Sequence, residues 1–431
     1  MELRLEVLRE GVKQGGAHEP APPRSWTYAP GTVVDVGRAD ERTLTLEDER
    51  VSRHHCTACW GPPPGGAPGP TGWWLIDAGS RSGTTVNDVP FAGEAILLRA
   101  GDLIRIGRSK LRVELGSAEA WGMDCAGCRR PAAQAPGPGL RHGRRWVCQE
   151  CLLGRSDGQR RVGEWVEVGE LGAGSNGKVL LAAGKEGERL AALKLTVRDP
   201  FGDVQAEGEA LARFRREVRI LRELNHPYVV RVYSAGTTED GYWVALELLE
   251  EDLLQLVRRE GPLSLARARQ VGEALLHGLS HLHARGVLHR DVKPSNVLLD
   301  AAGLPRLGDF GLCTGMGDTK LTATSMAMGT LYYTAPEQVE DAHQVDVRAD
   351  LYGWGATLYH ALAGTPPYGW ARSFPDVVRA LIQEELPALR AVRPDVPGPL
   401  SALVMRALCK DPAGRFSSAA EALRALQALP G

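Results

Sequence analysis

The spacing of apolar residues changes at Gly163, and this change restricts the chain to a multidomain fold. Before it, short runs such as TVVDV, WWLIDA and LIRIG alternate with Gly, Ser and Asp turns, which predicts an all-β sandwich. After it, a few strand-like runs give way to long amphipathic helices, for example over residues 265–285, which predicts an α+β domain. In this chain of 431 residues we therefore expect three units, at residues 1–118, 119–156 and 163–430.

Charge and hydropathy exclude several classes of protein. Lys and Arg (51) nearly balance Asp and Glu (53), so no overall field favours nucleic acid or an anionic membrane. The start MELRLEVLRE has no apolar signal core. The uncharged run at residues 351–371 contains His360 and the pair Pro366-Pro367, which favours a buried helix and a turn over a membrane span. We expect a cytoplasmic protein, in which the eight cysteines are metal ligands or buried thiols rather than disulfides.

The middle unit carries two Cys-x-x-Cys pairs, CAGC (Cys125, Cys128) and CQEC (Cys148, Cys151). This spacing matches the zinc ribbon, in which two knuckles donate four thiolates to a tetrahedral Zn²⁺. The unit is too short to have a core of its own, so zinc would supply its folding free energy. A redox pair or idle thiols is the alternative interpretation.

Two stretches rich in Pro and Gly, residues 61–71 and 129–145, predict surface loops. The second carries arginines that could bind nucleic acid or a phosphorylated chain, although a solvated loop is the favoured interpretation. These arginines are Arg129, Arg130, Arg141, Arg144 and Arg145.

The stretch SRHHCTACW contains a third Cys-x-x-Cys pattern, Cys56 and Cys59. If a strand begins near His55, side chains alternate between its faces, and two cysteines three positions apart point to opposite sides. We therefore expect no shared metal here, and a packing role for Cys56.

The last unit contains an ordered series of motifs: LGAGSNGKVL, AALK, FRREVRIL, HRDVKPSNVLL, GDFG and APE. A glycine-rich turn alone is a weak signal, but this set in this order resembles the eukaryotic-type (Hanks-type) serine/threonine protein kinases. High Ala, Gly, Arg and Pro usage is typical of a GC-rich bacterium.

The resemblance implies an α+β bilobal kinase fold, ATP and Mg²⁺ as cofactors, and a role for each matching residue. Asp291 would orient the substrate hydroxyl, and Asp309 would chelate Mg²⁺. Lys194 would contact the α- and β-phosphates and pair with Glu217. The implied catalytic residues are Asp291, Lys194, Glu217, Lys293, Asn296 and Asp309, with Asn296 holding a second Mg²⁺ ion. The implied ATP-binding residues are Leu171, Gly172, Gly174, Gly177, Val179, Lys194, Glu247 and Leu249, next to Leu246 as gatekeeper.

Specificity and regulation also follow from the resemblance. Lys293 and Thr330 match serine/threonine rather than tyrosine kinases, and Arg290 resembles kinases that are switched by phosphorylation of the activation segment. Candidate phosphosites are Thr319, Thr322, Thr324 and Ser325. Structural roles are implied for an ion pair between Glu337 and Arg415 and for Asp350 as a brace of the catalytic loop. Asn176 departs from the family pattern, in which an aromatic residue shields the phosphates, and this predicts looser ATP closure or slower turnover.

The first unit resembles a forkhead-associated (FHA) domain, a β sandwich that binds phosphothreonine peptides through loops at one end. The matching positions are Gly37-Arg38, Ser52-Arg53-x-His55, Ser80-x-x-Gly83-Thr84 and Val86-Asn87. The resemblance implies that Arg38 and Ser52 contact the phosphate. Peptide contacts are implied for Arg53, Arg81 and Ser82, and loop-bracing roles for His55 and Asn87. Ser82 departs from the family, which usually has Asn there.

Three hypotheses follow. The favoured one is a cytoplasmic ATP-dependent serine/threonine kinase for signal transduction, whose FHA unit docks phosphothreonine partners or its own phosphorylated segment. The second is a phosphopeptide-binding scaffold that binds nucleotide and barely turns over, motivated by Asn176. The third is a zinc-dependent nucleic-acid binder that uses the arginine-rich loop, and it is the least favoured because the net charge is −2.

Overall fold

The computed structural model describes most of the chain, and every structural statement below refers to the described residues. These are residues 2–9, 25–29, 32–39, 42–46, 48–64, 72–91, 95–99, 101–116, 125–129, 140–142, 145–154, 159–174, 177–184, 187, 189–197, 204–239, 241–309, 328–340 and 345–430. The chain divides into two compact units. Unit 1 comprises Met1–Arg198 and Val232–Leu248, and unit 2 comprises Asp199–Arg231 and Leu249–Gly431.

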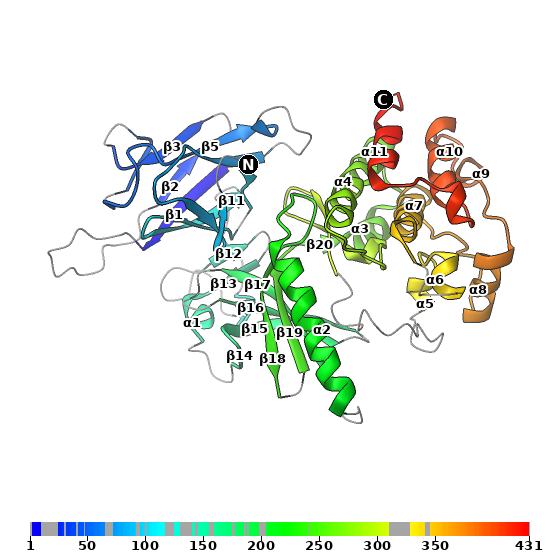
Figure 1. The fold of residues 1–431 in the computed structure, drawn as a ribbon, viewed down its shortest axis with the longest axis horizontal. Coiled ribbons are helices and arrows are strands. Elements are labelled where there is room, and N and C mark those ends of the chain that lie inside the picture. Colours follow the sequence, from blue (N-terminus) through cyan, green and yellow to red (C-terminus); the bar gives the residue numbers. More distant parts are fainter. Residues whose placement is uncertain are drawn as a thin grey trace. The chain divides into compact units, whose positions relative to one another are not determined.

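Unit 1 begins with a β sandwich, as predicted (Figure 1). One sheet has the strand order β2-β1-β11-β10-β7-β8. Its strands are β1 (Glu2–Arg9), β2 (Ser25–Tyr28), β7 (Thr84–Val86), β8 (Val89–Phe91), β10 (Leu103–Ile106) and β11 (Ser109–Gly116). The second sheet has the order β4-β3-β5-β6-β9. Its strands are β3 (Val33–Gly37), β4 (Leu44–Thr45), β5 (Cys56–Gly61), β6 (Gly72–Asp77) and β9 (Ala95–Leu97).

Strand β1 was not predicted from the sequence, although its alternation is plain. Leu3, Leu5 and Val7 are buried and join the sandwich core, while Arg4 between them is exposed. The strand pairs antiparallel with β11, with Leu5 opposite Val113. The charged residues of MELRLEVLRE thus mark the solvent face of an amphipathic strand.

The cysteine-containing module consists of a hairpin, β12 (Leu140–His142) and β13 (Arg145–Val147), and the short helix α1 (Gln149–Leu152). Its buried side chains form one core with residues of the following sheet, among them Val166, Leu181 and Leu190. The sequence predicts a unit too short for its own core, and in the structure the neighbouring sheet completes that core. The module is therefore packed on this sheet rather than being a free linker.

The sheet that follows has the antiparallel order β14-β15-β16-β17-β19-β18. Its strands are β14 (Arg161–Val162), β15 (Trp165–Gly174), β16 (Gly177–Ala183), β17 (Leu190–Val197), β18 (Val232–Thr238) and β19 (Gly241–Glu247). Val179 on β16 lies opposite Lys194 on β17, and Lys194 lies opposite Val244 on β19. The glycine-rich turn and the predicted ATP lysine are thus carried by neighbouring strands.

Unit 2 is mainly helical, with a small sheet of order β20-β21-β22. Its strands are β20 (Glu251–Asp252), β21 (Val297–Leu299) and β22 (Pro305–Leu307). Its helices are α2 (Val204–Glu223), α3 (Leu253–Glu260), α4 (Leu265–His283), α5 (Met328–Leu331), α6 (Pro336–Glu340), α7 (Val347–Ala363), α8 (Phe374–Gln383), α9 (Leu389–Val392), α10 (Gly398–Ala407) and α11 (Ala419–Gln427), with the 3₁₀ helices η4 (Pro294–Asn296) and η6 (Pro412–Gly414).

Helix α7 confirms the prediction of a buried helix in place of a membrane span. Its side chains are buried along most of its length, and Trp354 at its centre is fully buried. Asp346 caps the first turn by accepting a hydrogen bond from the backbone N–H of Arg348, and Gly364 ends the helix in the left-handed conformation. Among the described residues, no helix combines the length and apolar character that crossing a membrane requires.

Candidate functional site

The segment after α4 is held in place by a buried carboxylate. Asp350 on α7 is 2% exposed, and its two oxygens accept hydrogen bonds from the backbone N–H groups of His289 (2.9 Å) and Arg290 (2.7 Å). The Nε2 of His283, the last residue of α4, also contacts Asp350 at 2.8 Å. The predicted bracing role of Asp350 is confirmed, since loop backbone and helix end share one buried acceptor.

His289 connects this segment to the strand that precedes Asp309. Its Nδ1 accepts from the backbone N–H of Asp291 at 3.3 Å, and its Nε2 donates to the carbonyl oxygen of Gly308 at 2.9 Å. The backbone N–H of Gly308 in turn donates to the carbonyl oxygen of Asn296 at 2.8 Å. The predicted metal-binding residues Asn296 and Asp309 are therefore brought to one place by a histidine and a backbone bond.

Asp291 lies at the centre of a small polar cluster. Lys293 Nζ donates to Asp291 Oδ2 at 2.7 Å and to Thr330 Oγ1 at 3.0 Å. Asn296 Nδ2 donates to the carbonyl oxygen and to Oδ2 of Asp291, at 2.8 and 2.9 Å. The cluster thus combines a carboxylate, an ammonium group, an amide and a hydroxyl.

Arg290 and Asp309 both have left-handed backbone conformations, with φ of 64° and 56°. Non-glycine residues rarely adopt this region, and they do so where surrounding contacts determine the backbone. At Arg290 those contacts include its N–H to Asp350 and its carbonyl oxygen, which accepts from Gln338 Nε2 at 3.0 Å. The candidate phosphosites Thr319, Thr322, Thr324 and Ser325 lie outside the described residues.

The predicted ion pair between Glu337 and Arg415 is confirmed. The guanidinium group donates twice to the carboxylate, from Nη1 to Oε1 at 2.6 Å and from Nη2 to Oε2 at 2.7 Å. Arg415 is 3% exposed and also donates to the carbonyl oxygens of Cys409 and Lys410. This bidentate geometry fixes the segment before α11 to helix α6.

In unit 1, the glycine-rich turn connects β15 and β16. Gly177 has φ of 126°, and an added Cβ would lie 1.9 Å from the carbonyl oxygen of Leu195, so only glycine fits. Asn176 lies outside the described residues. Lys194 belongs to unit 1 and Glu217 to unit 2, so their pairing stays a prediction.

At one end of the sandwich, three loops bring the predicted phosphopeptide residues together. The backbone N–H of Arg38 donates to the carbonyl oxygen of Ser52 at 3.0 Å, and Arg38 Nε donates to that of Val51 at 3.2 Å. Gly37 makes this approach possible, because an added Cβ would lie 2.1 Å from the carbonyl oxygen of Arg53. Arg38 and Arg53 are exposed.

The loop of residues 79–83 contacts the segment from Arg50 to Ser52 at the same end of the sandwich. The backbone N–H of Arg81 donates to Ser52 Oγ at 3.2 Å, and Ser82 Oγ donates to the carbonyl oxygen of Arg50 at 2.9 Å. Since the Ser52 oxygen accepts from Arg81, its hydroxyl hydrogen is directed elsewhere. Exposed arginines and a serine hydroxyl therefore surround one small surface, as phosphate recognition requires.

His55 is fully buried beneath this surface and connects its loops. Its Nδ1 accepts from the backbone N–H of Ser52 at 3.1 Å, and its Nε2 contacts the carbonyl oxygen of Gly83 at 3.1 Å. This pair of bonds requires the neutral ring with hydrogen on Nε2. Burial lowers the pKa of His55 below its ordinary value of 6.5, against the Gly83 carbonyl and the carboxylates of Asp77 and Asp48, which raise it. The predicted bracing role of His55 is confirmed.

Asn87 has the predicted bracing role as well. Its Nδ2 donates to Asp102 Oδ1 at 2.7 Å, and its Oδ1 accepts from the backbone N–H of Leu103 at 3.0 Å.

Asp77 is a bracing residue that the sequence analysis did not predict. It accepts from the N–H groups of Gly79 and Ser80 and from the hydroxyls of Ser80 and Thr84. The sequence Asp-Ala-Gly-Ser at a strand end is a signal for such a turn.

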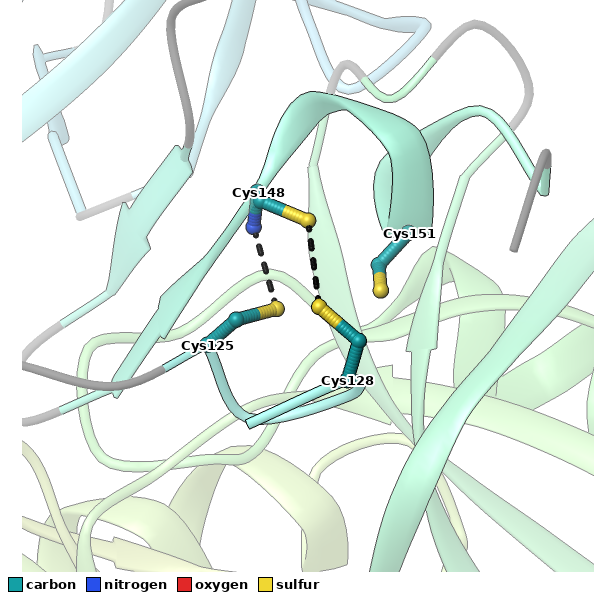
Figure 2. A group of neighbouring side chains, drawn as sticks. All are labelled: Cys125, Cys128, Cys148 and Cys151. Carbon is teal, nitrogen blue, oxygen red and sulfur yellow. Dashed lines mark hydrogen bonds between the residues drawn. The ribbon is translucent and has the colours of Figure 1, made fainter. Parts of the chain in front are cut away.

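The four cysteines of the middle module converge, and Figure 2 shows their sulfur atoms pointing toward one another. All four Sγ atoms lie within 4.8 Å of one another, and those of Cys128 and Cys148 are 3.7 Å apart. A tetrahedral zinc with Zn–S bonds of about 2.3 Å requires sulfur separations of about 3.8 Å. The donor set and its dimensions therefore fit Zn²⁺.

The surroundings of Cys125 favour its thiolate form, whereas burial raises the pKa of the Cys148 thiol. Burial would raise the pKa of the Cys125 thiol, but backbone N–H groups that donate to its sulfur outweigh burial and lower the pKa to about 7. One of these donors is the N–H of Cys148, at 3.2 Å. Anionic sulfur is the form in which cysteine binds a metal.

Cys56 and Cys59 both lie on strand β5, and they differ in burial as the predicted alternation requires. Burial alternates along β5, where Cys56 is fully buried and Cys59 is partly exposed. Burial raises the pKa of the Cys56 thiol, which keeps it neutral. Within the described part of the chain, the only group of this kind that could hold a metal ion is the one at residues 125–151.

Comparison with known proteins agrees with this geometry. Residues 165–427 match the protein kinase domain family, and residues 34–107 match the FHA domain family. The first match covers more than half of the chain, so the chain belongs to the protein kinase family, and it also contains an FHA domain. Both resemblances found in the sequence are confirmed, whereas the exact boundaries of the three predicted units stay predictions.

Curated relatives include serine/threonine-protein kinases of bacteria. PknE of Mycobacterium tuberculosis (strain H37Rv) is 36% identical over 251 residues, which cover 57% of this chain and 42% of the relative. PrkC of Bacillus subtilis is 30% identical over 263 residues, which cover 61% of this chain and 40% of the relative. The chain thus spans less than half the length of these relatives. A crystal structure of Rad53 residues 1–466 in complex with AMP-PNP aligns over 98% of each chain, with a TM-score of 0.48 and 20% identity.

The buried state of His55 leads to a pH prediction. Because its folded-state pKa is lowered, the stability it contributes is present above the unfolded value of 6.5 and is lost as the pH falls below that value. Titration from about pH 7.5 to about pH 5.5, followed by NMR of carbon-13-labelled histidine rings, should give His55 a pKa below 6.5. A His55→Gln variant assigns the signal, and a midpoint at or above 6.5 would contradict the prediction.

Proposed function

We propose that this chain is a serine/threonine protein kinase that transfers the γ-phosphoryl group of ATP to Ser or Thr hydroxyls of protein substrates. The observation that carries the proposal is the cluster in which Lys293 connects Asp291 to Thr330. Phosphoryl transfer depends on positioning and charge stabilisation more than on covalent help from the protein. This cluster supplies a positioned carboxylate with an ammonium group beside it.

Each residue of the cluster has a distinct task. Asp291 accepts a hydrogen bond from the substrate hydroxyl and orients its oxygen toward the phosphorus, and Lys293 stabilises the charge on the transferred group. Thr330 accepts from Lys293 and fixes the direction of its ammonium group. In the proposal, Lys194 contacts the α- and β-phosphates of ATP, and Glu217 pairs with Lys194.

The cofactor of the proposed reaction is Mg-ATP, which supplies the phosphoryl group and the charge neutralisation. Asn296 suits a metal ligand, because its Nδ2 is committed to Asp291 and its oxygen is the atom available to a hard cation. Asp309 is the other metal-binding residue of the proposal, and Glu247 and Leu249 carry the backbone groups for adenine. A reducing, ATP-containing compartment such as the cytoplasm would suit both this reaction and the thiols.

We further propose that the FHA domain binds phosphothreonine through Arg38 and Ser52, with Arg53, Arg81 and Ser82 in contact with the peptide. The grouping of these residues on three joined loops supports this assignment. Partners would be phosphorylated proteins, including the chain's own activation segment. Nucleic acid is not among the proposed partners.

The third part of the proposal is a structural Zn²⁺ held by Cys125, Cys128, Cys148 and Cys151. It is supported by sulfur positions that match tetrahedral zinc. Three of these cysteines are also buried in the core that the module shares with the kinase sheet. Zinc would therefore stabilise this sheet together with the module.

Activity is tested by incubating the full chain with γ-labelled ATP, Mg²⁺ and a protein substrate. Asp291→Asn should lower the rate at least about 100-fold, because the amide no longer accepts the hydroxyl proton. Asp395→Asn, at an exposed carboxylate, is the matched control and should keep wild-type activity. Nucleotide binding by the wild-type chain without repeated turnover would instead support the scaffold hypothesis.

Phosphopeptide binding is tested by titrating phosphothreonine peptides into the full chain. Arg38→Ala should weaken binding by about tenfold to a hundredfold, since a charge-assisted contact to the phosphate is lost. Arg105→Ala, an exposed arginine of the same domain that pairs with Asp88, should leave affinity unchanged. Equal affinity for phosphorylated and unphosphorylated peptides would reject the assignment.

Zinc is tested by native mass spectrometry of the full chain. One zinc ion should be retained per chain, and Cys128→Ser should lose it and lower the melting temperature, because a tetrahedral site needs all four ligands. Cys59→Ser should keep the ion. A wild-type chain purified with zinc in the buffer that carries no metal would rule this part out.

A further inference from the structure

Two side chains from outside the kinase match contact the end of strand β19. Arg99, which follows β9 of the FHA domain, donates from Nη1 to Glu247 Oε2. His142, at the end of β12 in the cysteine module, contacts the carbonyl oxygen of Leu248 through Nε2 at 2.7 Å. Glu247 and Leu248 are consecutive, so the two modules hold neighbouring residues, one by its side-chain carboxylate and the other by its carbonyl oxygen.

The Arg99–Glu247 pair is deeply buried. Each side chain is 3% exposed, so both charges have lost most of their water, and the ion pair offsets part of that loss. Removal of one partner of such a pair takes this compensation away from the buried charge that stays, and the surrounding structure must move to accommodate it. The position of Glu247 is therefore sensitive to Arg99.

The backbone of Arg99 is itself fixed. Its N–H donates to Asp102 Oδ2 at 2.9 Å, and its carbonyl oxygen accepts from the N–H of Asp102 at 3.1 Å. Asp102 is fully buried and also accepts from Asn87. The guanidinium group thus projects from a closed turn, which lets it act as a rigid support.

His142 packs against the turn that carries Arg99. An added Cβ at Gly101 would lie 3.6 Å from His142 Nδ1, so the ring packs against the turn that carries Arg99. His142 is 8% exposed, and its bond to a carbonyl oxygen requires hydrogen on Nε2. Leu248 also belongs to the hydrophobic core that contains Cys125, Cys148 and Cys151.

A second set of contacts connects the FHA domain to the same sheet at the turn between β16 and β17. Arg112 Nη1 donates to the carbonyl oxygen of Gly187 at 3.2 Å, and Arg189 Nη1 donates to Asn87 Oδ1 at 2.9 Å. Arg112 is 8% exposed. The sheet is therefore held at two separate places, one of which is the end of β19.

We infer that Arg99 and His142 are positioning residues of the nucleotide site: Arg99 holds the side chain of Glu247 and His142 holds the carbonyl oxygen of Leu248, in the segment assigned above to adenine binding. The inference rests on the proposed function, because it assumes that this segment binds adenine. It extends that function by making nucleotide affinity depend on the FHA domain and the cysteine module. Neither residue touches nucleotide: Arg99 acts through the Glu247 side chain, and His142 acts through the main chain of Leu248.

The test measures the affinity of the full chain for Mg-ADP by calorimetry, together with KM for ATP and kcat. Arg99→Met and His142→Leu should each weaken Mg-ADP binding and raise KM for ATP by about fivefold or more, with kcat at saturating ATP near the wild-type value. His142→Gln retains a donor of similar reach and should restore affinity toward the wild-type value. Arg105→Met, an exposed arginine of the same domain, should have no effect.

The outcomes separate the inference from the function on which it rests. A wild-type chain that binds no Mg-ADP refutes the proposed function. A wild-type chain that binds Mg-ADP, with Arg99→Met and His142→Leu binding equally well, overturns the inference alone. Native mass spectrometry checks that each variant keeps its fold and zinc. If Arg99→Met does not fold, the comparison of His142→Leu with His142→Gln decides, since equal affinities there would also overturn the inference.

Discussion

A buried carboxylate that accepts hydrogen bonds from loop backbone is the interaction on which the functional surfaces of this protein depend. Asp350 holds the N–H groups of His289 and Arg290, and it thereby sets the segment that ends at Asp291. Asp77 does the same for the loop that carries Arg81. A loop cannot satisfy its own N–H groups as a helix does, so a defined loop conformation needs an acceptor from elsewhere. The side chains of Asp291 and Arg81 are therefore positioned by backbone that these two carboxylates hold in place.

The parts of the site that the sequence predicted are those whose chemistry is encoded locally. HRDVKPSN places Asp291, Lys293 and Asn296 within six consecutive residues, so any fold of the kinase type brings them together. The two Cys-x-x-Cys pairs also specify their own geometry, because each pair occupies one tight turn. Alternation along β5 separated Cys56 from Cys59 without knowledge of the fold. Short-range spacing was sufficient in all three cases.

The missed contacts of Arg99 and His142 are long-range and have no local signature. Arg99 and Glu247 are 148 residues apart, and His142 and Leu248 are 106 residues apart. A single Arg or His in a loop is compatible with many partners, and only the packing of the FHA domain and the cysteine module on one sheet selects them. Strand β1 is different, because its signal is local: the period of two in Leu3, Leu5 and Val7 specifies a strand, and the charged residues between them lie on its other face.

The residues that match the kinase family are not the same as the residues that pack together in one compact unit of this chain. The kinase family match begins at residue 165, yet the sheet it opens shares its core with cysteines and a hairpin that precede the match. Compact unit 1 accordingly runs from Met1 to Arg198 and continues with Val232–Leu248, which crosses both matches and the module between them. A hydrophobic core is cooperative, because each buried side chain loses contacts when its neighbours leave. The stability of the sheet that carries Lys194 is therefore a property of unit 1 as a whole, and residues far outside the kinase motifs contribute to it.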